Sequence, residues 1–331
     1  MWIVAAGLAA LLALAGLVYQ RNGLARDARR FPAPGRFVDA AGQRLHVVCR
    51  GTGTPAVVFE SALATSSLSW TRVQDAVARF ASACAYDRAG FAWSDSSTGE
   101  TTFARTVDGL EAVVSSLSSK PPHVFVGHSF GVFVCLQYAA RHPGNVAGLV
   151  LVDPPSDWMP MDRRQRRLLR GGMAMSRLGG LLARIGVVRA SLALLTGGAP
   201  AATRNFVKVF GPTTARTLQR LVGEVRKLPE EIHPVVQAMW CRPKCFDAMA
   251  DTLRMMMEAT AAVGRITSLG DIPTIVISSG DQPLPIVDAH RALAALSSRG
   301  RVVIAAKSGH WIPYDEPHLI VDAIRHCRAG L

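Results

Sequence analysis

The chain has 331 residues and a mass of 35.4 kDa, which suits one large α/β domain with an insertion. Hydrophobic residues make up 49% and charged residues 18%, so a sizeable core is available and global disorder is excluded. The formal net charge of +13 indicates anionic surroundings, such as phospholipid headgroups, nucleic acid or an acidic substrate. Residues 154–270 contain 18 Lys and Arg against 8 Asp and Glu, so most of the excess lies in one internal segment.

The first element in chain order is an uncharged apolar run over residues 2–19. As a helix it spans about 27 Å, which nearly matches the roughly 30 Å of a bilayer core, and aromatic residues stand at both ends. We predict that residues 1–20 form a retained transmembrane anchor and residues 21–35 a juxtamembrane linker. The alternative is a secretory signal, whose cleavage would make the protein secreted or periplasmic. The absence of Lys and Arg before the run argues against it.

The membrane topology is predicted from the charges that follow the apolar run, which are Arg21, Arg26, Arg29 and Arg30. By the positive-inside rule this flank stays in the cytoplasm, so we expect a single-pass protein whose catalytic body faces the cytoplasm. The six cysteines are too few for a disulfide scaffold and show no pairing pattern. Unpaired cysteines agree with a reducing compartment.

The chain after residue 36 consists of short apolar strands that alternate with segments of helical periodicity. This alternation predicts an α/β fold with a mostly parallel central sheet flanked by helices. In such a sheet the reactive groups gather at the carboxyl ends of the strands. The predicted strands are residues 43–49, 56–59, 83–86, 123–126, 148–152, 273–278 and 301–305, and the predicted helices lie at residues 70–80, 103–117, 287–296 and 319–325 and in a segment ending at 141.

A nucleophile motif, Gly127-His128-Ser129-Phe130-Gly131, directly follows a predicted strand and opens a predicted helix. In this G-x-S-x-G pattern the serine lies on a sharp strand-to-helix turn, and its Oγ stands above the sheet. The residues two before and two after the serine approach each other so closely that only small side chains fit. The flanking strand and helix disfavour the alternative of a glycine-rich turn with an incidental serine, so we predict Ser129 as a nucleophile.

At this motif the chain resembles the α/β-hydrolase fold family. Residues 86–95, Tyr-Asp-Arg-Ala-Gly-Phe-Ala-Trp-Ser-Asp, are similar to that family's Y-D-x-x-G-x-G-x-S loop, with Ala92 in place of the second glycine. Ser308-Gly309-His310-Trp311 is similar to its terminal histidine loop. The resemblance covers about residues 36–153 and 271–331, which we predict to be the two parts of an α/β-hydrolase core.

The base predicted to activate Ser129 is His310, which follows the last apolar strand where the order Ser…Asp…His requires it. The resemblance implies two positions for the acid. Asp281, the favoured candidate, follows the strand at 273–278, and Asp153, the alternative, ends the strand at 148–152. Asp288, on the next predicted helix, is a third candidate. His128 occupies the variable position of the motif and is expected to pack or to line the pocket.

Two main-chain N–H groups, those of Leu63 and Phe130, are implied by the resemblance to bind the oxyanion. Leu63 lies in residues 60–70, Glu-Ser-Ala-Leu-Ala-Thr-Ser-Ser-Leu-Ser-Trp, which resemble the E-x-G-x-G-x-S-S-x-x-W loop of many bacterial members. Ala62 and Ala64 stand where glycines are common, so the resemblance leaves the exact backbone angles of this loop open. One oxyanion donor contributes on the order of 10²–10³ in rate.

Residues 154–270 separate two predicted strands by far more than a normal crossover, and their apolar spacing is helical. In the resembling family a lid lies here, so we predict an all-helical lid over Ser129. One interpretation of its basic start is an amphipathic face that rests on anionic lipid, and the other is a solvated face over packed helices. The arginines concerned are Arg163, Arg164, Arg166, Arg167 and Arg170.

These motifs favour a membrane-anchored serine hydrolase, similar to carboxylesterases and lipases, that cleaves small-molecule or lipid esters through an acyl-enzyme. The alternatives are an acyltransferase, thioesterase or lactonase with the same triad, and a catalytically silent membrane-bound binding protein. Serine at the nucleophile position disfavours haloalkane dehalogenases and epoxide hydrolases, which use aspartate there. No cysteine or histidine set has metal-ligand spacing and no nucleic-acid module carries the charge, so we expect no metal, organic cofactor or nucleic acid.

Overall fold

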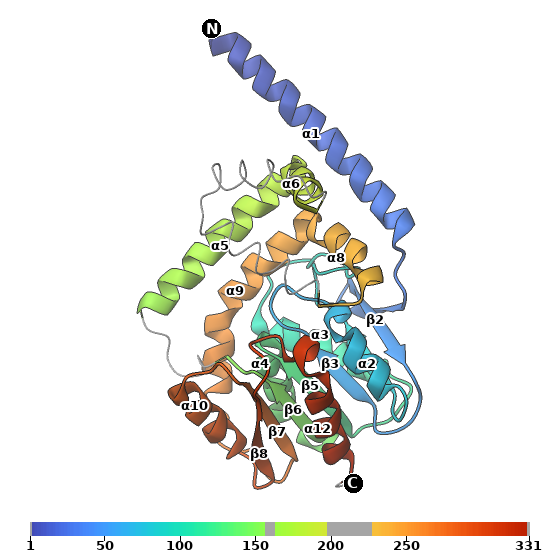
Figure 1. Ribbon diagram of the computed structural model, residues 1–331, viewed down its shortest axis with the longest axis vertical. Coiled ribbons are helices and arrows are strands. Elements are labelled where there is room, and N and C mark those ends of the chain that lie inside the picture. Colours follow the sequence, from blue (N-terminus) through green and yellow to red (C-terminus); the bar gives the residue numbers. More distant parts are fainter. Residues whose placement is uncertain (1, 156–162, 197–226, 330–331) are drawn as a thin grey trace. The chain divides into compact units, whose positions relative to one another are not determined.

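The computed structural model describes residues 2–155, 163–196 and 227–329, and these residues form two compact units (Figure 1). The core unit comprises Ala33–Gly171 and Asp251–Leu331, and the anchor unit comprises Met1–Pro32 and Gly172–Ala250. The predicted lid at 154–270 is therefore divided. Its described middle part belongs to the anchor unit together with the amino-terminal helix, and both of its ends belong to the core unit.

The core unit is built on an eight-stranded sheet with the strand order β1-β2-β4-β3-β5-β6-β7-β8. The six strands from β4 to β8 in this order are parallel, whereas β1 and β2 pair antiparallel at one edge. The predicted mostly parallel sheet is thus confirmed. The strands are β1 (Arg36–Ala40), β2 (Gln43–Arg50), β3 (Val57–Glu60), β4 (Ala83–Tyr86), β5 (His123–His128), β6 (Val146–Val152), β7 (Thr274–Ser279) and β8 (Gly300–Ala305).

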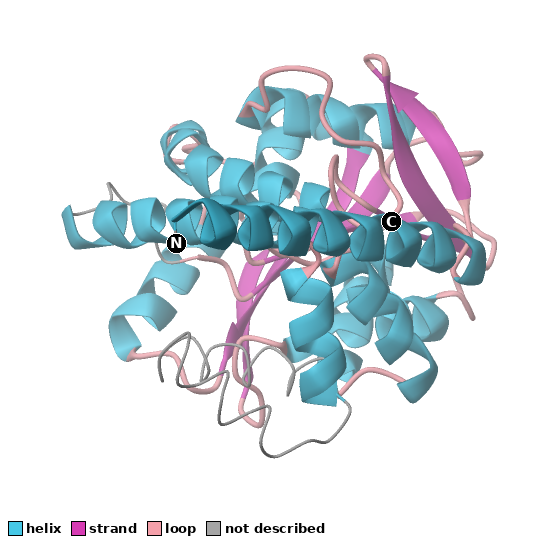
Figure 2. Ribbon diagram, turned by 90° about the horizontal axis from the view of Figure 1, so that it is seen from above, coloured by secondary structure: helices cyan, strands magenta, loops and turns pink. Residues whose placement is uncertain are grey.

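Helices cover both faces of this sheet, as Figure 2 shows. Successive strand side chains point to opposite faces: Val57 and Phe59 pack in one buried apolar cluster, and Val58, between them, packs in the other. One cluster includes residues of α3 (Phe103–Ser115), α4 (Phe130–Arg141) and α10 (Leu284–Ala294). The other includes residues of α2 (Thr71–Val77), α11 (Ile312–Asp315) and α12 (Pro317–Ala329). Short 3-10 turns span Ser67–Trp70 and Pro143–Asn145.

A disulfide bond links Cys49 on β2 to Cys84 on β4, two residues that face each other in the antiparallel pair. Their Cα atoms are 4.1 Å apart. Among the described residues the other four cysteines are free and buried. The expectation of unpaired cysteines is therefore wrong for this pair. The sequence offers no sign of it because 35 positions separate the two residues, and only the pairing of β2 with β4 brings them together.

The anchor unit contains α1 (Trp2–Arg30), α6 (Val187–Thr196), α8 (His233–Trp240), the 3-10 turn Glu230–Ile232, and parts of α5 (Arg163–Arg184) and α9 (Pro243–Val263). The linker predicted at 21–35 is helical over most of its length, because α1 continues as one helix through Arg30. That extension is held by buried polar contacts. Gln20 donates to the main-chain carbonyl of Cys241 at 2.7 Å and accepts from Arg189 at 2.9 Å, and Asp27 pairs with Arg189 at 2.7 Å.

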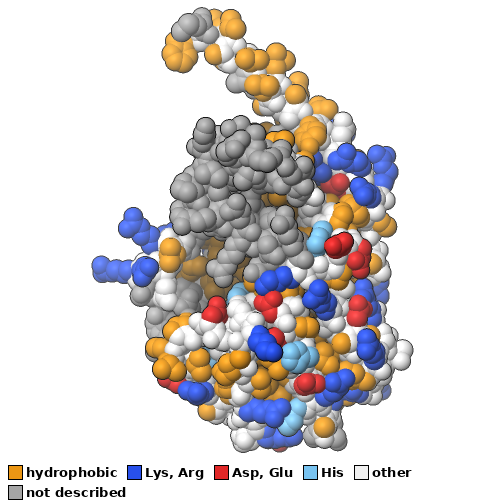
Figure 3. All heavy atoms as spheres, viewed as in Figure 1, with side chains coloured by type: hydrophobic (Ala, Val, Ile, Leu, Met, Phe, Trp, Pro, Cys, Tyr) orange, Lys and Arg blue, Asp and Glu red, His pale blue; other side chains and the backbone are white. Residues whose placement is uncertain are grey.

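The first part of α1 is the one described helix that is long and apolar enough to cross a membrane. Its apolar stretch is not buried against the rest of the protein, and its hydrophobic side chains stand exposed in Figure 3. Gly16 nevertheless contacts the turn between α5 and α6, because a Cβ atom there would collide with the carbonyl of Ile185. The helix is therefore exposed along its apolar length and packed at its carboxyl-terminal end.

Candidate active site

Ser129 lies on the turn between β5, which ends at His128, and α4, which begins at Phe130. Its backbone has φ 53° and ψ −119°, a conformation that a residue with a side chain adopts rarely and that is typical of strained functional turns. A Cβ atom on Gly127 would approach the carbonyl oxygen of Gly131 to 2.7 Å, and one on Gly131 would approach that of Glu60 to 2.5 Å. A side chain at Gly127 or Gly131 would therefore collide with the main chain, as predicted for the residues on both sides of Ser129.

His310 follows β8 and lies next to the turn that carries Ser129. His128 donates its Nε2 hydrogen to the carbonyl oxygen of His310 at 2.8 Å, and the two imidazole rings are 4.8 Å apart. The Nδ1 atom of His310 donates to Oδ2 of Asp153 at 2.7 Å. With the Nδ1 proton held there, a neutral His310 has its Nε2 lone pair free to accept a proton.

The carboxylate that pairs with His310 is that of Asp153, the alternative candidate, and not that of Asp281. The side chain of Asp153 is 1% exposed, and its Oδ1 accepts the main-chain N–H of Ser279 at 3.0 Å and the Gln282 amide at 3.2 Å. Asp281 is exposed and accepts instead from the hydroxyl of Ser279 at 2.9 Å. The third candidate, Asp288, lies on α10 and pairs with Arg291.

The order of the strands explains why Asp153, and not Asp281, pairs with His310. Asp153 follows β6, which is the neighbour of β5, whereas Asp281 follows β7, one strand farther from Ser129. Asp153 also has a positive φ of 41°, which is uncommon for a residue with a side chain and turns the chain sharply at the end of β6. Both aspartates end a parallel strand at the same edge of the sheet, so the local pattern alone does not separate them.

The electrostatic environment favours a charged Asp153 and a neutral His128. Burial on its own would raise the pKa of Asp153, but the hydrogen bond and the charge of His310, together with the Ser279 and Gln282 donors, lower it below its ordinary value. Burial, and secondly the charge of His310, lower the pKa of His128 to about 3. His128 thus acts as a neutral donor, whereas the His310–Asp153 pair can hold a positive charge beside a negative one.

Of the two predicted oxyanion donors, Phe130 directly follows Ser129, and Leu63 lies in the loop after β3, the strand that pairs with β5. Phe130 is the first residue of α4, where the N–H groups have no partner within the helix. Leu63 stands between Ala62, which is buried, and Ala64, whose φ of 62° lies in the left-handed region. Ala64 therefore has a backbone conformation that a glycine would adopt without strain.

A buried ion pair lies directly beneath this loop and was missing from the predicted site. Arg88 contacts Glu60, and the two side chains are 6% and 0% exposed. Tyr86 also donates to Glu60. Both charged residues follow or end a fully buried apolar strand, and a charge in such a position requires a partner. That placement is the signal by which sequence reasoning could have found them.

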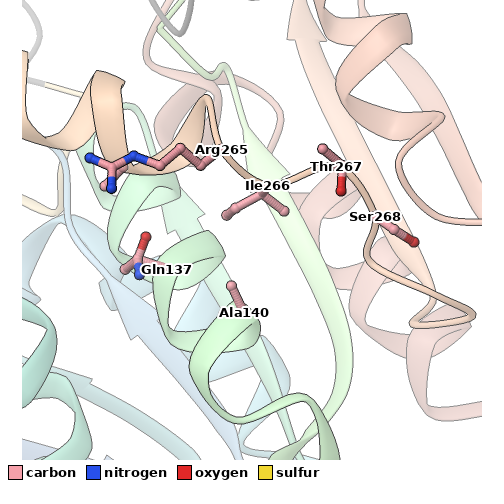
Figure 4. Close-up of a pocket in the computed structure, with 7 residues that line it drawn as sticks. Gln137, Ala140, Arg265, Ile266, Thr267 and Ser268 are labelled. Carbon is pink, nitrogen blue, oxygen red and sulfur yellow. The ribbon is translucent and has the colours of Figure 1, made fainter.

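One pocket of about 390 Å³ among the described residues lies away from Ser129, His310 and Asp153. Figure 4 shows that Gln137 and Ala140 of α4 line it on one side, and residues 265–268, which follow α9, line it on the other. The Oε1 atom of Gln137 has no hydrogen-bond partner there. In the part of the chain that the structure describes, no three His, Cys, Asp or Glu side chains are grouped as a metal site.

Comparison with known proteins agrees with this architecture. The family model described as "alpha/beta hydrolase fold" matches residues 55–193. A thermophilic esterase from Thermogutta terrifontis superimposes with a TM-score of 0.61 at 16% identity, covering 89% of this chain and 98% of that one. An epoxide hydrolase from Bacillus megaterium gives a TM-score of 0.64 at 14% identity, covering 89% and 100%. The protein has the alpha/beta hydrolase fold.

Among curated sequences, the chain is similar to the uncharacterized protein YqjL of Bacillus subtilis, with 22% identity over 290 residues. That match covers 83% of this chain and 84% of YqjL. The family model and the solved structures confirm the fold that the G-x-S-x-G motif and the terminal histidine loop imply.

Proposed function

We propose that the protein is a serine hydrolase that cleaves carboxylic esters, with Ser129 as nucleophile, His310 as general base and Asp153 as the acid. The observation that carries this proposal is the 2.7 Å hydrogen bond between His310 Nδ1 and Asp153 Oδ2, next to the turn that holds Ser129. A carboxylate in this position fixes the imidazole tautomer and stabilises its cation. The His128 contact to His310 supports the same assignment, because it links the turn that carries Ser129 to the histidine loop.

The proposed reaction runs in two halves through an acyl-enzyme. His310 Nε2 accepts the Ser129 hydroxyl proton as Oγ attacks the ester carbonyl, and the N–H groups of Leu63 and Phe130 bind the resulting oxyanion. His310 then donates that proton to the departing alcohol. Water, deprotonated by His310, attacks the acyl-Ser129 ester, and the products are a carboxylic acid and free Ser129.

A serine at this position supports ester cleavage over the other activities named among the structural neighbours. Epoxide hydrolases and haloalkane dehalogenases use an aspartate there, which attacks a saturated carbon. A serine hydroxyl with a paired imidazole is suited to an acyl carbon. An acyltransferase would use the same first half-reaction, with an acceptor alcohol in place of water in the second half.

The test is to measure fluorophosphonate labelling and hydrolysis of p-nitrophenyl esters of increasing chain length, with wild type and Ser129→Ala. We expect Ser129→Ala to lose both. Ser298→Ala, which changes an exposed serine outside the proposed site, is the matched control and is expected to keep both. Labelling that persists in Ser129→Ala would reject the assignment. Adding short alcohols and measuring ester products separates hydrolysis from acyl transfer.

We also propose that α1 is retained as a single-pass membrane anchor. Its apolar part is exposed, whereas Gln20 and Asp27 of its polar part are buried in the anchor unit. Cleavage near residue 20 would remove or loosen the partners of buried Arg189. Such a cut would remove Gln20 and leave Asp27 on a free chain end, which weakens the pairing of the buried Arg189. A helix whose next turns belong to the fold is better suited to an anchor than to a cleaved signal.

The surface of α5 supports contact with an anionic membrane. Leu168, Met175, Leu178 and Leu181 are 50–66% exposed, whereas Ser176, Gly180 and Ala183 of the same helix are buried. One side of α5 therefore packs and another presents apolar residues to the surroundings. Basic side chains project from the amino-terminal end of α5 (Figure 3, left), and all five arginines predicted for this face are exposed. Apolar residues flanked by arginines are typical of helices at the lipid interface.

An environment-sensitive NBD label at Leu178→Cys tests this contact, because the free cysteines of the described chain are buried and will resist labelling. With phosphatidylglycerol vesicles we expect the emission to shift to the blue and to be quenched by nitroxide lipids. The same label at Ser298→Cys, an exposed position in the core unit, is the control. Equal emission from both positions would show that α5 stays in water.

The compartment is indicated by two features that disagree. Four arginines after the apolar run favour the cytoplasmic side, whereas the Cys49–Cys84 bond favours an oxidising compartment. We propose that the core unit faces the oxidising side, because Cys49 is exposed and a reducing cytosol would have access to the bond. The charge rule describes a bias, whereas the disulfide requires an oxidant.

A further inference from the structure

Arg88 makes an unusual set of contacts for a residue outside the proposed triad. Its guanidinium donates to the carboxylate of Glu60 and also to two successive main-chain carbonyls, those of Ser61 and Ala62. The Ala62 contact measures 2.7 Å. Arg88 is 7% exposed, so these bonds are made away from water. The guanidinium fork thus clamps the start of the loop that follows β3.

The clamped carbonyl fixes the direction of a neighbouring donor. The carbonyl of Ala62 and the N–H of Leu63 belong to one planar trans peptide, in which C=O and N–H point in opposite directions. Thr65 adds a second hold, because its hydroxyl donates to the same Ala62 oxygen at 3.1 Å. With the oxygen held toward Arg88 and Thr65, the Leu63 N–H must point to the other side of the loop.

Arg88 also contacts the second oxyanion donor. Its Cζ lies 5.2 Å from the ring centre of Phe130, at a cation–π distance. Phe130 is the first residue of α4 and supplies the other proposed N–H. One buried cation therefore touches both halves of the proposed oxyanion hole, the loop after β3 and the start of α4.

We propose that Arg88 is a positioning residue that orients the Leu63 N–H toward the substrate oxyanion, with Glu60 holding the guanidinium in place. The inference rests on the proposed serine-hydrolase function. Its physical basis is the alanine at position 64, with φ 62°, where glycine is common in the resembling loops. A loop that holds a strained residue needs external bonds to keep its shape, and Arg88 supplies them at the peptide before Leu63.

The test compares Arg88→Lys, Arg88→Met and Glu60→Gln with wild type, each normalised by fluorophosphonate titration of active sites. A lysine can pair with Glu60 but has no planar fork for two carbonyls. We expect Arg88→Lys and Arg88→Met to lower kcat per titrated site on the order of 10²-fold, which is the lower range for loss of one oxyanion donor. We expect KM to change less than about threefold, and Glu60→Gln to lose less kcat because Arg88 keeps its carbonyl contacts.

A second readout is the affinity for an alkyl boronic acid, which forms a tetrahedral adduct with the nucleophilic serine. If Arg88 orients the oxyanion donor, the affinity falls by the same factor as kcat/KM. A structural role would lower the titrated fraction of active sites and leave kcat per site unchanged. An unchanged kcat per titrated site in Arg88→Lys would overturn the inference, even if Arg88→Met fails to fold. Failure of the proposed function is distinguishable, because it would appear as labelling of Ser129→Ala.

Discussion

His128, which precedes the proposed nucleophile, donates its Nε2 hydrogen at 2.8 Å to the main-chain carbonyl of His310, the proposed general base. The imidazole of His128 thus holds the loop that carries His310, and the two ring centres are 4.8 Å apart. Only one of them can carry a positive charge at low cost. Burial and the charge of His310 lower the pKa of His128 to about 3, so the charge is reserved for His310, which has Asp153 as its partner.

This relationship predicts a pH-dependent stability that depends on His128. Because its pKa is lowered from 6.5 to about 3 on folding, the unfolded chain binds the proton more readily. Stability is therefore complete above about pH 6.5 and falls as the pH drops toward 3. Between pH 7.5 and pH 5 the free energy of unfolding should fall by about 2 kcal/mol more in wild type than in His128→Gln. The glutamine keeps a hydrogen-bond donor and does not titrate. Denaturant unfolding in detergent at the two pH values measures it, and parallel losses in both proteins would contradict it.

The choice of acid is tested by Asp153→Asn and Asp281→Asn. In Asp153→Asn the imidazole of His310 loses its charged partner and its tautomer is no longer fixed, so kcat should fall by about 10³–10⁴-fold. Asp281→Asn should change kcat less than about threefold, because its carboxylate bonds to Ser279 and not to His310. Steady-state kinetics on a p-nitrophenyl ester compares them. A larger loss in Asp281→Asn would return the acid to the position that the sequence favoured.

The Cys49–Cys84 bond predicts both a compartment and a stability. Acid quenching of the cells, N-ethylmaleimide in denaturant to block free thiols, and then reduction and mass spectrometry should find these two cysteines oxidised and Cys135 and Cys327 reduced. Alkylation of Cys49 and Cys84 before reduction would restore the cytoplasmic prediction.

The same bond closes a long stretch of chain between its two cysteines. The double variant Cys49→Ala/Cys84→Ala should therefore be on the order of 3 kcal/mol less stable than the oxidised protein. Wild type in dithiothreitol is the control and should approach the variant. Equal free energies of unfolding for oxidised and reduced wild type would show that the bond does not stabilise the protein.

The ion pair between Asp27 and Arg189 predicts that the extension of α1 is part of the fold. Both side chains are less than a tenth exposed, so Asp27→Asn leaves a buried guanidinium without its counter-charge. We expect this single change to lower the free energy of unfolding by about 3 kcal/mol. The double variant Asp27→Leu/Arg189→Met removes both charges and should recover most of it. Thermal unfolding in detergent compares the three proteins, and an unchanged melting temperature in Asp27→Asn would show that this segment is not docked.

The places of Ser129 and His310 in the fold could be predicted because their signals are local. A serine between two closely spaced glycines, after a strand and before a helix, determines its own backbone shape, and Gly127 and Gly131 do approach closely in the structure. His310 follows the last strand and precedes a helix, which is enough to place it at the carboxyl edge of a parallel sheet. The apolar run of α1 is equally local, since its length and composition are properties of consecutive residues.

The partners of these residues could not be predicted, because they depend on which strands become neighbours. Asp153 and Asp281 end similar strands, and only the order β5-β6-β7 decides which carboxylate reaches His310. Cys49 meets Cys84, and Arg88 meets Glu60, through the pairing of β4 with β2 and β3. A sequence by itself determines which side chains are apolar, small or nucleophilic and where the chain turns. Which distant charges and thiols come within bonding distance is decided by tertiary packing, because those contacts depend on strand order and register rather than on any spacing along the chain.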